Sequence, residues 1–198
     1  NFLLYGFASG LRFNLIASLA TMVSYFFQKK EKVSLDNSLF YLVVCFILWT
    51  VITSVFTISN SSAVWDEWNK LFKIFLLFFF AVLIINKKHQ VDTFCWAIVL
   101  SIGFYSVVET LKFIVSGGGH KLAGPNFSIL HDRNHFALAV NMMIPILIYL
   151  ISQTKIKIIK LGLLGGLFLS VVCVIGTSSR GGFVGLAILG GIWLLKSK

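Results

Sequence analysis

The sequence predicts an all-α fold, a polytopic bundle of about seven transmembrane helices, and two observations support this prediction. Of the 198 residues, 58% are hydrophobic and only 12% are charged, whereas charged residues make up about a quarter of a typical soluble domain. The apolar residues also form long runs without the alternation of a transmembrane barrel strand. We therefore expect a single transmembrane helical domain over residues 1–198, forming part of a longer protein.

The apolar runs are compared with the length of a membrane helix, which needs about 20 residues to cross a hydrocarbon core of about 30 Å. The third and seventh runs are short, but flanking lysines can snorkel, and a broken or tilted helix would shorten the seventh. The segment NSSAVWDEWNK, residues 60–70, is expected to be a polar loop. The expected spans are approximately 11–28, 39–59, 71–85, 93–115, 135–152, 158–176 and 182–195.

Alternating spans divide the lysines and arginines between two sides of the membrane. The side that receives more of them is expected to be cytoplasmic; it carries Lys29, Lys30, Lys32, Lys87, Lys88, Lys155, Lys157, Lys160, Lys196 and Lys198. The outer side carries Arg12, Lys70, Lys73, Lys112, Lys121, Arg133 and Arg180, against Asp66, Glu67, Glu109 and Asp132. This net positive face could attract an anionic headgroup or a diphosphate. Alternatively, single cations snorkel or pair locally, as Glu109 and Lys112 would at a spacing of three.

The segment TSSRGG lies between the last two apolar runs and contains Ser178, Ser179, Arg180, Gly181 and Gly182. Serine caps helix starts, which bind anions, and arginine offers phosphate a planar pair of donors. The glycines would let a ligand approach the backbone. The segment is therefore either a phosphate site or an ordinary capped turn.

Two glycine pairs at a spacing of four, Gly162 with Gly166 and Gly181 with Gly185, suit close packing of the last two helices. Because glycine is common in membrane helices, chance explains these pairs equally well.

Residues 116–145 hold three of the four histidines and both prolines. The sequence HDRNH places His131 and His135 four residues apart, as in zinc sites, but Asp132 replaces the general-base Glu and no third ligand follows. We expect no metal and no other cofactor. Asn134 and His135 are instead expected to begin the fifth span, where His135 would bind a sugar or phosphate or cap the bundle.

The run LSIGFYSVVETLKFIVSGGGHKLAGPNFSILHDRNHFALAVNMMIPIL, followed by TSSRGGFVGLAIL, resembles the O-antigen ligase and polymerase superfamily. The resemblance covers nearly the whole chain, and within the superfamily it is greatest to exosortase-associated O-glycosylation ligases. It implies a metal-independent, multi-pass glycosyltransferase at the outer face of the bacterial inner membrane. Such enzymes transfer a saccharide from undecaprenyl diphosphate to a hydroxyl of an acceptor glycan, lipid or protein, and nucleic acid is not expected as a partner.

The resemblance also implies roles for individual residues. The arginine of the family's SRG motif matches Arg180, next to Ser179, and would hold the diphosphate. The family's N-H-F-A segment matches Asn134, His135, Phe136 and Ala137, whereas Arg133 departs from the usual asparagine. We expect Lys121, Arg133, Asn134 and His135 to form one wall of an outer cavity, with Arg180 on another.

The catalytic residues stay unknown, because the family's general base is a histidine on a large loop that nothing in this chain matches. Ligase and polymerase of the same superfamily differ only in their acceptor, so both remain open. A non-enzymatic lipid-carrier or polysaccharide transport protein, or a purely structural membrane subunit, is the other alternative.

Overall fold

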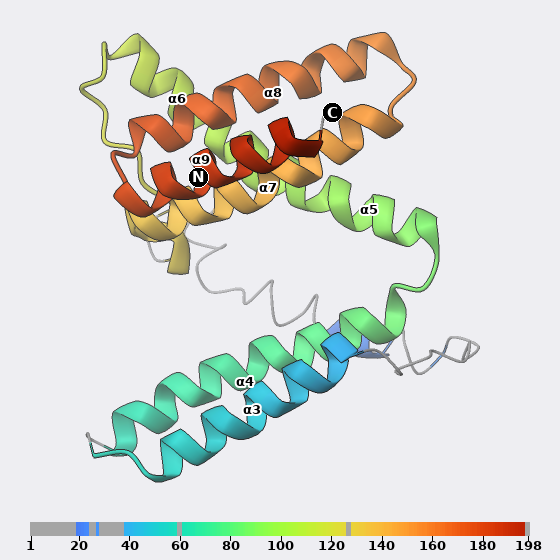
Figure 1. The fold of residues 1–198 in the computed structure, drawn as a ribbon, viewed down its shortest axis with the longest axis vertical. Helices are drawn as coiled ribbons and strands as arrows, with labels where there is room; N and C mark the ends of the chain where they lie inside the picture. Colours follow the sequence, from blue (N-terminus) through green and yellow to red (C-terminus); the bar gives the residue numbers. More distant parts are fainter. Residues whose placement is uncertain (1–18, 24–26, 28–37, 59–60, 126–127, 197–198) are drawn as a thin grey trace. The chain divides into compact units, whose positions relative to one another are not determined.

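The computed structural model describes the chain except residues 1–18, 24–26, 28–37, 59–60, 126–127 and 197–198. Across the described residues the structure is helical, without a β-strand (Figure 1). The chain divides into two units, Asn1–Lys87 and Lys88–Lys198, each described here by itself. Apart from residues 19–23 and 27, the expected span 11–28, including Arg12, lies outside the described part of the chain.

The first unit contains a pair of antiparallel helices, α3 (Ser38–Val55) and α4 (Ser61–Ile84) (Figure 1). Aromatic pairs form contacts between the two helices. The ring centroids of Phe40 and Phe79 lie 5.5 Å apart in an edge-to-face arrangement. Phe46 and Phe75 form a second such pair at 6.0 Å. Edge-to-face ring pairs contribute stabilising free energy beyond that of the apolar area they bury.

The expected polar loop at residues 60–70 is wrong, because α4 already begins at Ser61. Local side-chain pairs three and four residues apart favour this helical start. Trp65 contacts Trp68, and Trp68 stacks on Phe72 at a centroid distance of 5.3 Å. Lys70 binds Glu67 in the same turn. The polar residues therefore form the first turns of a 24-residue helix.

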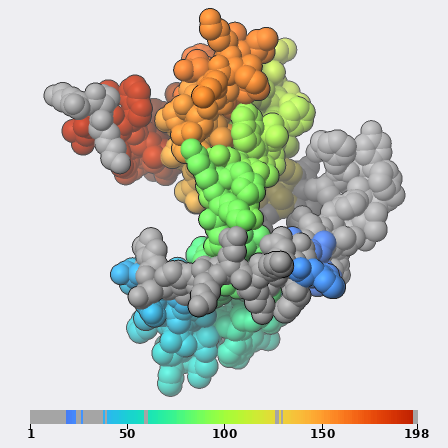
Figure 2. Space-filling view, turned by 90° about the vertical axis from the view of Figure 1, so that its right-hand side faces the viewer, coloured from blue at the N-terminus to red at the C-terminus, as the bar shows by residue number. Residues whose placement is uncertain are grey.

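The second unit begins with one continuous helix formed by α5 (Lys88–Ile98), the π-helical turn η2 (Val99–Gly103) and α6 (Phe104–Val115). A short 3-10 turn, η3 (Ile129–His131), precedes α7 (Arg133–Gln153). Two further helices, α8 (Lys157–Gly176) and α9 (Arg180–Lys196), complete the unit. In Figure 2, α8 and α9 appear in orange and red at the surface of this unit.

Three helices among the described residues are long and apolar enough to cross a membrane: Lys88–Val115, Arg133–Gln153 and Lys157–Gly176. The second and third lie within two residues of the expected spans 135–152 and 158–176, whereas the first begins five residues before the expected span 93–115. Phe40–Val55 and Arg180–Leu195 are apolar but shorter than these three.

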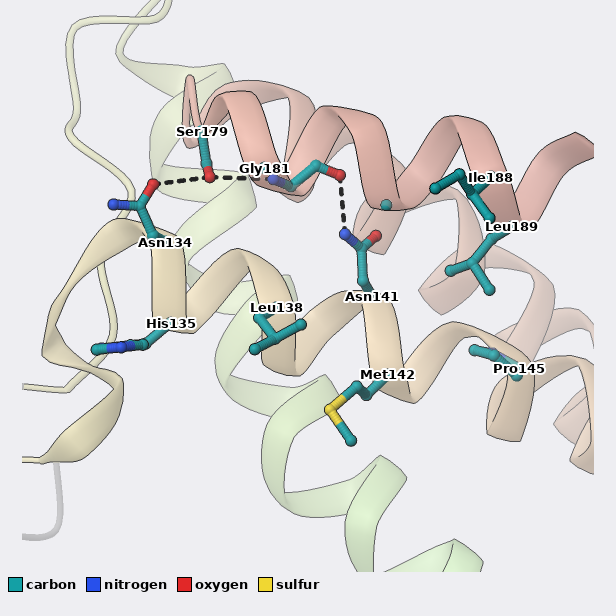
Figure 3. A pocket seen from close by; sticks show the side chains of 12 residues that line it. Asn134, His135, Leu138, Asn141, Met142, Pro145, Ser179, Gly181, Ile188 and Leu189 are labelled. Carbon is teal, nitrogen blue, oxygen red and sulfur yellow. Dashed lines mark hydrogen bonds between the residues drawn. The ribbon is translucent and has the colours of Figure 1, made fainter. Parts of the chain in front are cut away.

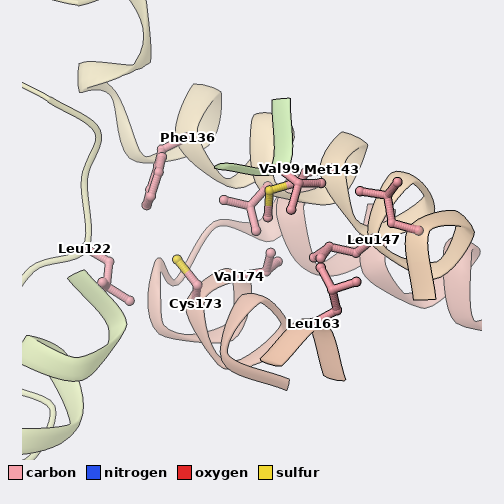
Figure 4. Close-up of a cluster of buried hydrophobic side chains, with 10 residues drawn as sticks. Val99, Leu122, Phe136, Met143, Leu147, Leu163, Cys173 and Val174 are labelled. Atoms are coloured by element: carbon pink, nitrogen blue, oxygen red, sulfur yellow. The ribbon is translucent and has the colours of Figure 1, made fainter. Parts of the chain in front are cut away.

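α7 lies at the centre of the second unit, between α8, α9 and the η2 turn. The buried residues Phe136, Val140, Met143, Leu147 and Leu150 recur every three or four positions and so share one face of α7. This face packs against α8, against Val99 of the η2 turn and against Leu122 in the segment between α6 and η3, as Figure 4 shows. The opposing buried side chains are Val99, Leu122, Leu163, Cys173 and Val174. This packing fixes the position of the start of α7, where the predicted site residues lie.

Candidate functional site

The start of α7 is fixed by Asp132, whose carboxylate accepts hydrogen bonds from the backbone N–H groups of Asn134 (2.8 Å) and His135 (3.4 Å). These bonds favour the charged form, so the pKa of Asp132 lies below its ordinary value, chiefly through the N–H of Asn134. His131 lies in the preceding η3 turn. His131 and His135 therefore do not share one regular helix as zinc ligands of the HExxH type would.

The start of α9 is capped by Ser179, which confirms the serine cap expected from the sequence. Its Oγ accepts the N–H of Gly182 at 3.1 Å. The same hydroxyl donates to Oδ1 of Asn134 at 2.8 Å (Figure 3). Ser178, just before the cap, has a positive φ of 52° and makes the turn out of α8. The Ser179 hydroxyl therefore ties the starts of α7 and α9 together.

From these linked starts, α7 and α9 run parallel to each other and in close contact (Figure 3). Asn141 Nδ2 donates to the carbonyl oxygen of Gly182 at 2.8 Å. A Cβ at Gly182 would lie 2.7 Å from Cβ of Ala137, and one at Gly185 would lie 2.9 Å from Nδ2 of Asn141. Two glycines at a spacing of three thus allow the close approach.

The prediction that glycine pairs let the last two helices pack closely on each other is wrong, because the glycines of α9 pack against Ala137 and Asn141 of α7. Gly185 packs closely, but its partner in the contact is Gly182, because Gly181 faces no neighbouring atoms. A Cβ at Gly162 or Gly166 would also meet nothing within 4 Å. Gly162 is exposed and Gly166 half-buried, so neither glycine is needed for a close helix contact among the described residues.

A groove of about 650 Å³ runs along the α7–α9 contact (Figure 3). Most of its lining is apolar, and the polar side chains that it does contain lie mainly at the helix starts. The polar lining comes from Asn134, His135 and Ser179, with Gly181, Gly182 and Asn141 beside them. The apolar lining comes from Leu138, Met142, Pro145, Ile188 and Leu189. The groove therefore suits a ligand with a polar head and an apolar tail.

Asn141 brings an unusual polar group to this groove. Its side chain is 5% exposed, and Oδ1 has no hydrogen-bond donor among the described residues. Pro145, one turn later, also has no N–H to offer the backbone carbonyl of Asn141. An unsatisfied buried acceptor costs about 1–3 kcal/mol. Asn141 thus marks a position where a hydrogen-bond donor of a ligand or a water would be favourable.

A second hollow, of about 670 Å³, lies beside the same helix starts. Polar and charged groups line part of it, and apolar side chains of α6 and α8 line the rest. The polar lining comes from His120, Lys121, Arg133, Thr177 and Ser178. Neither Lys121 nor Arg133 forms an ion pair with a described acidic residue. This hollow is therefore cationic.

The predicted site residues divide between these two cavities. Asn134, His135 and Ser179 line the groove, whereas Lys121 and Arg133 line the second hollow. Arg180 is exposed at the start of α9 and lines neither. The prediction that these residues form facing walls of a single cavity is therefore wrong. Successive residues of a helix point about 100° apart, which separates Arg133 from Asn134.

Sequence reasoning also missed the contact between Glu109 and His120, and it missed Asn141. Glu109 pairs with Lys112 at 2.7 Å, as that spacing indicated, but its other oxygen bonds His120 at the same distance. A carboxylate inside an apolar helix is the signal that could have identified this site. No such signal identified Asn141. The described residues contain no group of three side chains able to hold a metal ion.

Residues 1–155 match the family of unknown function DUF5935. Because the match covers more than half of the chain, the protein belongs to this family. Comparison with curated proteins gives no match, and comparison with solved structures gives none either.

Proposed function

We propose that this member of the DUF5935 family is a membrane glycan ligase of the O-antigen ligase and polymerase superfamily. It would be a multi-pass protein of the bacterial inner membrane with about seven spans. It would transfer a saccharide from undecaprenyl diphosphate to an acceptor hydroxyl at the outer face, without a metal ion. The observation that carries the proposal is the α7–α9 groove, which is polar at two helix starts and apolar beyond them.

The polar end of the groove suits a diphosphate. A helix start bears a partial positive charge, and α7 and α9 begin side by side, joined by Asn134 and Ser179. Asp132 and Ser179 already accept the N–H groups of Asn134, His135 and Gly182, so in the first turn of α9 the N–H groups of Arg180 and Gly181 are left for an anion.

The first residue of α9 is Arg180, whereas Arg133, the first residue of α7, lines the second hollow. Anions bind at such helix starts, and guanidinium groups add charge and paired donors. Arg180 is exposed and unpaired among the described residues, so its side chain is free to reach a phosphate.

The apolar part of the groove suits a polyprenyl tail. Its lining side chains are open to the surroundings, since Leu138 is 56% exposed, Met142 66% and Ile188 57%. In a bilayer these residues would face lipid. A lipid-linked donor could therefore enter sideways, with its tail in the hydrocarbon core and its head at the helix starts.

The same geometry supports transfer as well as binding. The acceptor oxygen would form a bond to the anomeric carbon of the donor sugar as the bond from this carbon to the diphosphate breaks. Negative charge then grows on the departing diphosphate. Helix starts and an arginine positioned at that charge stabilise the transition state more than the ground state.

The test uses the intact protein in proteoliposomes with a lipid-linked glycan donor and an acceptor glycan. Arg180→Ala is expected to lower the transfer rate by about 10²-fold or more, the usual effect of losing a group that stabilises developing charge. Lys160→Ala, an exposed cation in the first turn of α8, serves as the control and should transfer normally.

Binding of labelled undecaprenyl diphosphate is measured in parallel. Donor binding by the wild type without any product would contradict the ligase and favour a non-enzymatic carrier protein. If Arg180→Ala transfers the glycan at the rate of the wild type, Arg180 does not have the role assigned to it.

A further inference from the structure

The second hollow lies where three apolar helices end or begin. Its lining comes from the last turn of α6, the segment that follows α6, the first residue of α7 and the end of α8. These helices belong to the three that are long and apolar enough to cross a membrane. In a bilayer the hollow would therefore lie near the membrane surface, at the depth of the lipid headgroups.

Two cationic side chains of this hollow lack an anionic partner. Lys121 and Arg133 are exposed, and neither forms an ion pair with a described acidic residue. The acidic side chains at this end of the unit are engaged elsewhere. Both carboxylate oxygens of Glu109 are already bonded, and Asp132 accepts backbone N–H groups of α7. An anion that neutralises the two cations would therefore be favourable.

The donors of the hollow suit a phosphate group. The guanidinium of Arg133 offers two parallel N–H donors, and the ammonium of Lys121 adds a second positive charge. Ser178 lines the same hollow and contributes an exposed hydroxyl. These three side chains come from three different segments, so one phosphate would link the segment after α6, the start of α7 and the end of α8.

The packing beneath these donors is fixed by Gly176 at the end of α8. A Cβ at this position would lie 2.5 Å from Cδ1 of Leu122 and 3.1 Å from Cε1 of Phe113. The glycine therefore lets the segment after α6 pack directly on α8. Leu122 is only 3% exposed, so the backbone next to Lys121 is held in place before any ligand binds.

Apolar side chains continue from the hollow along one face of α8. Val172 and Ile175 line the hollow, and the exposed residues Leu161, Leu164 and Phe168 precede them at spacings of three or four. We call these five residues the α8 stripe, which extends for about 21 Å at 1.5 Å per residue. Half of the hydrocarbon core is about 15 Å thick. The stripe is therefore long enough to contact an acyl chain throughout one leaflet.

We propose that the second hollow binds the headgroup phosphate of an anionic glycerophospholipid, whose acyl chains lie along the α8 stripe. Lys121 and Arg133 bind the phosphate, and the hydroxyl of Ser178 donates to it. A zwitterionic lipid carries its own cation beside the phosphate and so neutralises these side chains less well. This site does not rest on the proposed glycan transfer, and it is separate from the α7–α9 groove.

The test titrates the intact protein in a neutral detergent with phosphatidylglycerol and measures the melting temperature, which a ligand of the folded state raises as its concentration grows. Phosphatidylglycerol should stabilise the protein, whereas phosphatidylcholine at the same concentration should not. Each cation near a lipid phosphate contributes about fivefold in affinity. Lys121→Ala with Arg133→Ala should therefore need about 30-fold more phosphatidylglycerol for the same rise.

The matched control is Lys155→Ala with Lys157→Ala, which removes two exposed cations from the other end of the unit. This variant should respond to phosphatidylglycerol as the wild type does. Equal stabilisation by the two lipids, or equal losses in the two double variants, overturns the inference. If Lys121→Ala with Arg133→Ala does not fold, the single variant Arg133→Gln should weaken binding about fivefold, and unchanged binding overturns the inference.

Glycerol phosphate, which has the phosphate without the acyl chains, distinguishes a lipid from a soluble anion. It should stabilise the protein much less than phosphatidylglycerol does. Equal stabilisation by both would show that the hollow takes a free anion, and it would overturn the lipid assignment.

Two further measurements separate this site from the donor groove. Arg180→Ala should bind phosphatidylglycerol as the wild type does, and Lys121→Ala with Arg133→Ala should retain binding of labelled undecaprenyl diphosphate. Loss of phosphatidylglycerol binding in Arg180→Ala would place the lipid in the groove, and loss of undecaprenyl diphosphate binding in the double variant would make the hollow part of the donor site. Either result overturns the inference. Neither measurement requires glycan transfer, so a failure of the proposed function is recognised separately.

Discussion

At the residue scale, Asp132 links the protonation of one side chain to the stability of α7. Its backbone hydrogen bonds place its pKa below the ordinary value of 3.8. A lowered pKa in the folded state contributes stability above the unfolded value, and this contribution is lost as pH falls through the folded value. The cap should therefore weaken only in strong acid.

Asp132→Asn tests this expectation, because asparagine also caps helices but does not titrate. We expect the melting temperature of the wild type in detergent to fall relative to that of Asp132→Asn once the pH drops below about 3.8. Near neutral pH the difference between the two proteins should stay constant. An unchanged difference throughout the acid range would show that the carboxylate gains nothing from these N–H groups.

The chemistry of single site residues was predictable from the sequence, but their partners were not. Ser179 was expected to cap a helix because its residue type does so wherever a helix starts. Its bond to Asn134 joins residues 45 positions apart, and only the packing of α7 against α9 brings them together. Glu109 shows the same limit, since its local partner Lys112 was predicted and its more distant partner His120 was not.

At the element scale, the α7–α9 contact depends on one face of α9 having no side chain. Gly182→Ala should destabilise the protein by about 1–3 kcal/mol, because the new Cβ would overlap that of Ala137. Gly181→Ala is the matched control, with the same change in the neighbouring residue, where nothing lies within 4 Å. It should be neutral or stabilising by up to about 1 kcal/mol, since alanine favours helix.

The measurement is the melting temperature of both variants in the same detergent, with near-ultraviolet circular dichroism as a check on side-chain packing. Equal effects of the two substitutions would contradict the close contact between α7 and α9. A loss confined to Gly182→Ala would support it.

Helix positions followed from hydropathy where apolar runs were bounded by polar residues. The expected spans 135–152 and 158–176 differ by at most two residues from Arg133–Gln153 and Lys157–Gly176. At residues 60–70 hydropathy failed, because polarity suggested a loop whereas pairs such as Glu67 with Lys70 favoured helix. Hydropathy does not predict the π-helical turn at Val99–Gly103. In this turn Gly103 faces the side chain of Met143.

At the scale of the whole second unit, the cations lie at two opposite ends. At one end Lys88 bonds Gln153, and Tyr149 bonds Asp92, close to Lys155 and Lys157. At the other end lie the starts of α7 and α9, with Lys121, Arg133 and Arg180. The sequence placed these two groups on opposite sides by counting charges along alternating spans. The number of spans and their orientation in the membrane stay predictions.

Cysteine labelling in intact cells tests that orientation, in a variant whose Cys45, Cys95 and Cys173 are replaced by alanine. The 21 residues of α7 extend for about 31 Å at 1.5 Å per residue, enough to cross the hydrocarbon core. His131→Cys precedes α7 and Lys155→Cys follows it, and both positions are exposed. Because the lysine-rich end should be cytoplasmic, a membrane-impermeant maleimide should label His131→Cys directly and Lys155→Cys only after permeabilisation. Labelling of both positions from outside would show that α7 does not cross the membrane. The reverse pattern would place the groove and the cationic hollow on the cytoplasmic side, where the proposed outer-face transfer could not occur.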